Sequence, residues 1–159
     1  MRIGLISDTH GRLRAEVFDI LAGVEHILHA GDIGPADLLD ELEALAPVTA
    51  VWGNTDGFDL RARVPEVAAV ELAGARIVVA HGHQLGSPDP AGLREAHAGA
   101  DVIVYGHTHR PLVDPGRPLV VNPGSAGAAR FGLAPSVGIL TLDPTGAREP
   151  DVELVELDR

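Results

Sequence analysis

The sequence predicts an α/β fold in which two packed β-sheets carry helices on their outer faces. The first third of the chain alternates short apolar runs with amphipathic segments, a pattern typical of parallel strands joined by crossover helices. Paired apolar runs around tight turns follow in the rest of the chain and indicate antiparallel strands. With 159 residues, of which 45% are hydrophobic, the chain suits one domain over residues 1–159.

The first third contains three predicted strands and two predicted helices. Short apolar runs that end at polar residues predict the strands, over residues 3–6, 26–30 and 48–52. Apolar residues at helical spacing predict the helices between them, over residues 13–21 and 38–45. Pro47 ends the second helix, because proline cannot continue the helical hydrogen-bond pattern.

The remainder of the chain predicts mainly strands. Two apolar runs around a tight turn at Gly74 predict a hairpin, over residues 67–72 and 75–80. A weaker helix is expected over residues 90–98. Further apolar runs predict four more strands, over residues 102–105, 119–121, 137–142 and 152–157.

Composition excludes several classes of site and partner. The chain has no cysteine, which rules out disulfides and thiolate metal sites. Its formal net charge of -11 repels phosphate at long range, so a long nucleic acid is not an expected partner. No segment approaches the roughly 20 apolar residues of a membrane span, and the short apolar start does not make a signal peptide. We therefore expect a cytoplasmic protein without a membrane partner.

Metal-ligand residue types follow one predicted strand after another. Because sites in α/β sheets form at the carboxyl ends of the strands, these side chains are expected to converge. In Asp8-Thr9-His10 and in His107-Thr108-His109 the two candidate ligands are two residues apart. Side chains at this spacing point the same way on an extended segment. Oxygen and nitrogen ligands of this kind suit manganese, iron, zinc or nickel. The seven candidates are Asp8, His10, Asp32, Asn54, His81, His107 and His109.

Five short motifs occur in order along the chain. They are Ser7-Asp8-Thr9-His10-Gly11, Gly31-Asp32, Gly53-Asn54-Thr55-Asp56, His81-Gly82-His83 and Gly106-His107-Thr108-His109. Together they resemble the signature motifs of the calcineurin-like metallophosphoesterases, and the resemblance runs from residue 1 to about residue 130. The short length and the segment Asn122-Pro123-Gly124-Ser125 further resemble the YfcE-type phosphodiesterase subfamily.

The resemblance implies a four-layer α/β/β/α sandwich of two mixed sheets that holds two divalent metal ions. By the same resemblance, Asp32 bridges the two ions. Manganese is the expected metal, with nickel, zinc or iron as alternatives. The ligands implied for the first ion are Asp8, His10, Asp32 and His109, and those for the second are Asp32, Asn54, His81 and His107.

The implied reaction is the hydrolysis of a small phosphodiester, with a hydroxide that bridges the two metals as the nucleophile. Asp32 and Asn54 are the expected catalytic residues among the ligands. Many relatives have a histidine directly after this asparagine, but here the position is Thr55, which cannot act as an acid near neutral pH. His83 is our candidate for the missing proton donor. The subfamily also lacks that histidine and is associated with phosphodiesters, so we favour a phosphodiesterase.

Two other functions stay open. A retromer coat subunit of this fold is a non-catalytic scaffold with a degraded site, whereas the complete ligand set here favours chemistry. A phosphomonoesterase or nucleotide hydrolase of the same superfamily is the second alternative. Relatives are often dimers or tetramers, so a homodimer or tetramer is expected.

Several further residues are ambiguous in the sequence. Asp56 either orients a ligand histidine or sits in a turn, and Asn122-Pro123-Gly124-Ser125 is either a turn or part of the site. We interpret the histidines outside the motifs as surface or core residues and expect little substrate role for the arginines near the motifs. These residues are His26, His29, His97, Arg110 and Arg130.

Overall fold

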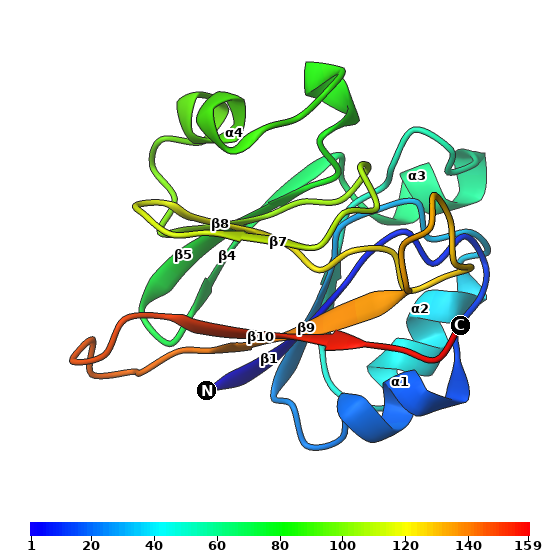
Figure 1. Ribbon diagram of the computed structural model, residues 1–159, viewed down its shortest axis with the longest axis horizontal. Coiled ribbons are helices and arrows are strands. Elements are labelled where there is room, and N and C mark those ends of the chain that lie inside the picture. Colours follow the sequence, from blue (N-terminus) through cyan, green and yellow to red (C-terminus); the bar gives the residue numbers. More distant parts are fainter.

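Two five-stranded sheets pack face to face in the computed structural model, which describes residues 1–159, and helices lie outside them (Figure 1). Helices α1 (Ala15–Ile20) and α2 (Asp37–Glu43) lie against the first sheet. Helix α4 (Pro90–Ala96) lies on the outer side of the second sheet. The predicted four-layer α/β/β/α sandwich of two mixed sheets is confirmed.

The first sheet has the strand order β10-β9-β1-β2-β3. Strand β1 pairs in parallel with β2, and β2 in parallel with β3, while β9 and β10 join as antiparallel strands. Helices α1 and α2 therefore connect the parallel strands of this sheet. Its strands are β1 (Arg2–Ile6), β2 (His26–His29), β3 (Val48–Ala50), β9 (Ser136–Thr141) and β10 (Asp151–Glu156).

The second sheet has the strand order β4-β5-β6-β8-β7. Strands β4 and β5 form the predicted antiparallel hairpin, and β5, β6 and β8 run parallel to one another. Strand β7 closes the other edge as an antiparallel neighbour of β8. Its strands are β4 (Val67–Leu72), β5 (Ala75–Ala80), β6 (Val102–Val104), β7 (Leu112–Asp114) and β8 (Leu119–Asn122).

Three apolar clusters fill the three spaces between the four layers. Alternation along β1 divides its side chains, because Ile3 and Leu5 face the second sheet while Ile6 faces the helices. Leu93 of α4 packs with Tyr105 and the outer face of the second sheet. Aliphatic side chains make nearly all of these contacts, as the low aromatic content requires.

Two elements were missed in the sequence. Helix α3 (Phe58–Arg63) has six residues and buries only Leu60, so it shows no amphipathic repeat. Strand β7 has three half-buried residues and lies at a sheet edge, so it lacks an apolar run. A short 3-10 turn, η1 (His83–Leu85), also follows β5. The helices are all too short and too polar to cross a lipid bilayer.

Candidate metal centre

The seven predicted ligands gather where strands of both sheets end. Segments after β1, β2 and β3 supply four of them, and segments after β5 and β6 supply three. Neighbouring ligand atoms lie 3.1–3.4 Å apart within two groups, and Oδ1 of Asp8 lies 3.9 Å from Nε2 of His81 between the groups. The convergence predicted from strand ends is therefore present in the structure for Asp8, His10, Asp32, Asn54, His81, His107 and His109.

Two overlapping groups of side chains have the spacing of a metal site, and both include Asp8. The first joins Asp8 to His10 and His109, and the second joins it to Asp32 and His81, with the ligand atoms of each group within 4.8 Å of one another. Asn54 Oδ1 lies 3.1 Å from His81 Nε2, which places it beside the second group. The geometry thus separates the ligands into two adjacent sets.

The carboxylate of Asp8 fits a cation at this place. Its Oδ2 accepts hydrogen bonds from the Ser7 hydroxyl, at 2.6 Å, and from the backbone N–H of His107, at 3.1 Å. Its Oδ1 is buried and has no hydrogen-bond partner. A buried carboxylate oxygen is strongly unfavourable unless a donor or a positive ion compensates it. The residues present therefore fit a divalent metal.

His81 is oriented by the backbone. Its Nδ1 lies 2.8 Å from the carbonyl oxygen of Ala30, so Nδ1–H donates there and the lone pair of Nε2 points into the site. This Nε2 lies 3.3 Å from Oδ2 of Asp32. Metal-binding histidines are commonly fixed by such a second hydrogen bond.

Asp32 and His81 stabilise each other's charged forms. Burial opposes both charges, but the hydrogen bond and the charge of Asp32 raise the pKa of His81 above its usual value. Burial also opposes the charge of Asp32, yet His81 and the Thr55 backbone N–H lower its pKa below its usual value. A metal ion and a proton therefore compete for the space between these two side chains.

Most of the ligands sit on strained backbone. Of the seven non-glycine residues with positive φ, five are predicted ligands, with φ between 46° and 70°. Such conformations are uncommon outside glycine and concentrate at functional sites. The turns aim side chains from the strand ends toward one point. These five residues are Asp8, His10, Asp32, His107 and His109.

Two glycines allow the ligand loops to approach one another. A Cβ at Gly106 would lie 2.1 Å from the Ser7 hydroxyl oxygen and 2.6 Å from Oδ2 of Asp8. A Cβ at Gly53 would lie 2.1 Å from Oδ1 of Asp32. Because no side chain fits at these distances, the loops after β3 and β6 need glycine there.

Asp56 joins two ligand loops rather than orienting a histidine. Its Oδ1 accepts the backbone N–H groups of Ile33 and Gly34, at 2.9 and 3.0 Å, and its Oδ2 accepts that of Gly53, at 2.8 Å. It is buried. Neither reading from the sequence described this role, because the N–H groups of Ile33 and Gly34 belong to a loop far away in the sequence and not to a ligand histidine or to the turn.

The segment Asn122-Pro123-Gly124-Ser125 forms hydrogen bonds to two of the ligand loops. The amide nitrogen of Asn122 donates to the carbonyl of Gly106 and to the Thr108 hydroxyl, at 3.0 Å each. Ser125 Oγ donates to the carbonyl of Asp8, at 2.8 Å. This segment therefore holds the loops after β1 and β6, and the reading that places it at the site is the correct one.

His29 is the supporting residue that the sequence did not reveal. It is fully buried, as expected of a core histidine, and its Nδ1 accepts the backbone N–H of Gly31 at 3.2 Å. Nε2–H is then free to donate to the Thr9 hydroxyl, at 3.0 Å, which donates to the carbonyl of Ile33 at 2.8 Å. Burial lowers the pKa of His29 to about 3. A neutral imidazole thus connects the loops after β1 and β2.

His83 and Arg130 flank the ligands on different sides. The His83 ring centroid lies 5.4 Å from that of His81 and 5.5 Å from that of Trp52, and its Nε2 lies 3.7 Å from Oε1 of Glu66. Burial lowers the pKa of His83. Burial also lowers the pKa of His10, and the nearby positive charge of Arg130 acts in the same direction. Arg130 is therefore closer to the centre than its sequence context indicated.

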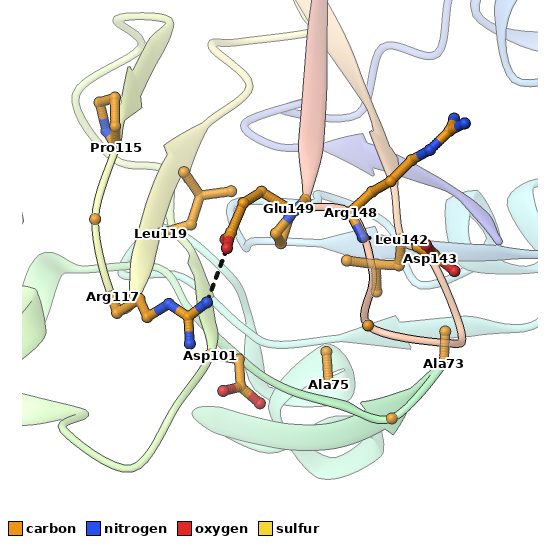
Figure 2. A pocket seen from close by; sticks show the side chains of 14 residues that line it. Ala73, Ala75, Asp101, Pro115, Arg117, Leu119, Leu142, Asp143, Arg148 and Glu149 are labelled. Carbon is orange, nitrogen blue, oxygen red and sulfur yellow. Dashed lines mark hydrogen bonds and ion pairs between the residues drawn. The ribbon is translucent and has the colours of Figure 1, made fainter.

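A cavity lies away from these residues (Figure 2). It measures about 390 Å³ and is lined by the loops at residues 73–75, 115–119 and 142–150, at the opposite ends of the strands. An ion pair between Arg117 and Glu149, at 2.8 Å, crosses it. Its acids Asp101 and Asp143 already accept backbone N–H groups. We therefore place the candidate site at the ligand cluster and not in this cavity.

Comparison with known proteins identifies the family. A family model described as the calcineurin-like phosphoesterase superfamily domain matches residues 1–145. A probable metallophosphoesterase of Methanothermobacter thermautotrophicus is 41% identical over 151 residues, which cover 90% of this chain and 87% of that protein. Phosphodiesterase YfcE of Escherichia coli is 31% identical over 170 residues, which cover 90% and 89%.

Solved structures of two kinds share the fold. A structure described as a novel archaeal phosphodiesterase has a TM-score of 0.77 and 28% identity, and the match covers 98% of this chain and 100% of that one. Vps29 of Entamoeba histolytica, crystallised as a zinc complex, has a TM-score of 0.77 and 25% identity, with 98% and 99% covered.

The first prediction concerns the buried His29. Because its pKa is about 3 in the folded protein and near 6.5 when unfolded, the unfolded chain binds one more proton between these values. The free energy of unfolding of the metal-free protein should therefore fall as pH drops below 6.5, by up to about 1.4 kcal/mol per pH unit from this residue. Urea unfolding between pH 4.5 and 7 measures the slope. His29→Gln should flatten it, and an unchanged slope contradicts the assignment. His97→Gln, at the end of α4, is the control and should alter the slope less.

The second prediction concerns Asp56. Asp56→Ala leaves three backbone N–H groups without their acceptor, so the ligand loops should separate. We expect metal affinity to fall about 10- to 100-fold, as measured by calorimetry, although no ligand is changed. Asp101→Ala, which removes the acceptor of the Arg76 N–H far from the site, is the matched control. Loss of stability with unchanged metal affinity would show that Asp56 does not support the site.

Proposed function

The chain belongs to the calcineurin-like phosphoesterase superfamily, and we propose that it is a phosphodiesterase that uses two divalent metal ions to hydrolyse small phosphodiesters. The observation that carries this proposal is the complete set of seven competent ligands around the unpartnered Oδ1 of Asp8. Two bound ions would lower the pKa of water and hold the oxygens of the phosphoryl group. We further propose manganese as the metal, with nickel, zinc or iron as alternatives.

The ligand residues lie on two sides of the site. Asp8 and His109 meet at 3.2 Å on the side of the loop after β1, and Asp32 and His81 meet at 3.3 Å on the other. Asn54 is exposed and lies beside His81, so its amide oxygen completes the second set while its amide N–H₂ faces solvent and the substrate. We assign the bridging position to Asp32, as the resemblance implies, and its Oδ2 lies 3.3 Å from His81 Nε2 and 3.8 Å from His10 Nε2. Asp8 also stands between the two sets, because its Oδ1 lies 3.2 Å from His109 Nε2 and 3.9 Å from His81 Nε2.

Leaving-group protonation falls to His83 in this proposal. Thr55 follows Asn54 and has no acidic proton near neutral pH. The His83 ring contacts those of His81 and His107, with centroids 5.4 and 6.5 Å away, so it reaches the edge of the second ligand set. A phosphodiester with a good leaving group depends least on this proton, and a poor alkoxide depends on it most.

A non-catalytic scaffold is the second candidate function, because Vps29 shares the fold. The two candidates differ in what they require of the ligand cluster. A scaffold needs an intact surface, whereas an esterase needs all ligand atoms aimed at one point, as the backbone bond to His81 and the strained ligand turns achieve here. The fixed orientation of the ligand side chains therefore supports the enzyme over the scaffold.

The proposal also covers the partners of the protein and its place in the cell. An acidic surface with a cationic metal centre suits a small phosphodiester and disfavours a long nucleic acid. We propose a cytoplasmic enzyme that forms a homodimer or tetramer.

The third prediction tests the reaction. Metal-stripped protein should regain cleavage of bis-p-nitrophenyl phosphate when manganese, nickel or zinc is added, with weaker cleavage of p-nitrophenyl phosphate. Asp32→Asn should lower the rate at least about 100-fold, because a bridging carboxylate is lost. Asp37→Asn, on the exposed first turn of α2, is the control and should be unaffected. Two bound metals without turnover of either ester would favour the scaffold.

The fourth prediction tests His83 through the leaving group. His83→Ala should lower kcat for a diester with an alkyl leaving group about 100-fold and for a p-nitrophenyl diester much less. The contribution should grow toward mildly acidic pH, because burial lowers the pKa of His83 and keeps it neutral near pH 7. Equal kcat values for both esters in the variant and the wild type would exclude His83 as the donor.

A further inference from the structure

An exposed phenylalanine stands beside the metal ligands. The ring centroid of Phe131 lies 6.1 Å from that of His109, with the planes at 61°. His109 in turn places Nε2 3.2 Å from Oδ1 of Asp8. Phe131 is 76% exposed, so most of its surface meets solvent. One side chain therefore separates an open aromatic face from the centre of the ligand cluster.

The backbone at Phe131 has a conformation that is unusual for a bulky side chain. The N–H of Leu133 donates to the carbonyl of Arg130 at 2.9 Å, and Phe131 and Gly132 between them have φ of 55° and 72°. Two consecutive positive φ values define a tight turn that favours Asn-Gly, and a bulky residue in the first position is strained. The comparable turn between β4 and β5 holds only Ala73 and Gly74.

Packing within the chain does not account for the ring. Exposure of a large aromatic side chain leaves its apolar surface in water, and the chain has only three phenylalanines, one tryptophan and one tyrosine. Trp52, the other aromatic residue near the ligands, is already covered, because Arg61 lies 4.2 Å above its ring and His83 packs against it. Phe58 is also exposed, at 85%, but its ring contacts no ligand histidine, so Phe131 is the exposed aromatic ring in contact with the site.

The segment that carries Phe131 is anchored at the centre. It connects β8 to β9 and runs beside the loop that follows β1 (Figure 1). Ala126 N–H donates to the carbonyl of Ser7 at 2.9 Å, and a Cβ at Gly127 would lie 2.7 Å from the carbonyl oxygen of Thr9. Arg130, next to the ring, lines one small hollow together with the ligand His109 and with Ser125. A ring and a cation are therefore held together at the rim.

We propose that Phe131 is a stacking platform that selects phosphodiesters whose ester group carries a planar ring. Resting on the proposed phosphodiesterase function, it assigns the substrate class. The phosphoryl group lies on the metal centre, Arg130 attracts its negative charge, and the ring of the ester group stacks on the exposed face of Phe131. An aryl ester and a nucleotide share this chemistry and differ in the distance from the ring to the phosphorus.

Binding of non-hydrolysable phosphonates tests the platform without turnover. Calorimetry on the manganese-loaded protein compares phenylphosphonate with methylphosphonate. The third probe is the phosphonate analogue of thymidine 5′-monophosphate, with CH₂ in place of the 5′ oxygen, which places the ring one sugar farther away. The wild type should bind at least one ring-bearing probe about 3- to 10-fold more tightly than methylphosphonate, the range of an aromatic pair. A preference for phenylphosphonate identifies an aryl group, and a preference for the nucleotide identifies a base.

Substitutions separate stacking from a structural role. Phe131→Asn removes the ring while suiting a positive φ, and it should abolish the preference without changing methylphosphonate affinity or the number of bound metals. Phe131→Tyr should restore the preference. Phe58→Ala, which removes the other exposed phenylalanine, should leave it intact.

Four results overturn the platform, and the last of them overturns the phosphodiesterase as well. If the preference survives in Phe131→Asn, the ring does not select the substrate, and if methylphosphonate affinity or metal content falls equally, Phe131 only covers His109. Intact diester turnover with equal binding of all probes refutes the platform alone. Absence of binding by every probe, together with absence of turnover, refutes the phosphodiesterase and the platform with it.

Discussion

The structure depends on two buried carboxylates that have no lysine or arginine beside them. Every ion pair of Asp8 and Asp32 is made with a histidine, and Oδ1 of Asp8 has no hydrogen-bond partner. Burial of such groups is unfavourable unless positive charge compensates them. A divalent metal bound there would supply that charge, so in our proposal the site and the stability of this end of the sandwich depend on the same ions.

The rest of the architecture serves to hold these carboxylates and their histidines in place. Parallel strands deliver their loops to one edge, and left-handed turns redirect the ligand side chains toward a common point. The supporting contacts are polar and cross between loops. Asp56 joins the loops after β2 and β3, His29 joins those after β1 and β2, and Ser125 holds the loop after β1. Strain in the ligand turns is tolerated because several independent hydrogen bonds fix them.

The rim of the site differs from its floor. The floor consists of ligands fixed by backbone groups, which suits a phosphoryl group of any ester. The rim carries side chains that face solvent, with His83 and Trp52 on the side of β5 and Arg130 with Phe131 after β8. Chemistry and selectivity are thus assigned to separate layers of the site, and the rim can vary without disturbing the ligands.

The sequence by itself determined the layers, most strands and the strand ends at which the seven predicted ligands converge. Apolar periodicity sets which faces are buried, and strand-end ligands recur at a spacing that one edge of a sheet explains. Short elements such as α3 and β7 were not predicted from the sequence, because they have no apolar pattern of their own and are stabilised by neighbouring elements. The roles of Asp56, His29 and Phe131 were decided by tertiary structure alone. Each depends on contacts between loops far apart in the chain, and such contacts leave no periodic trace in the sequence.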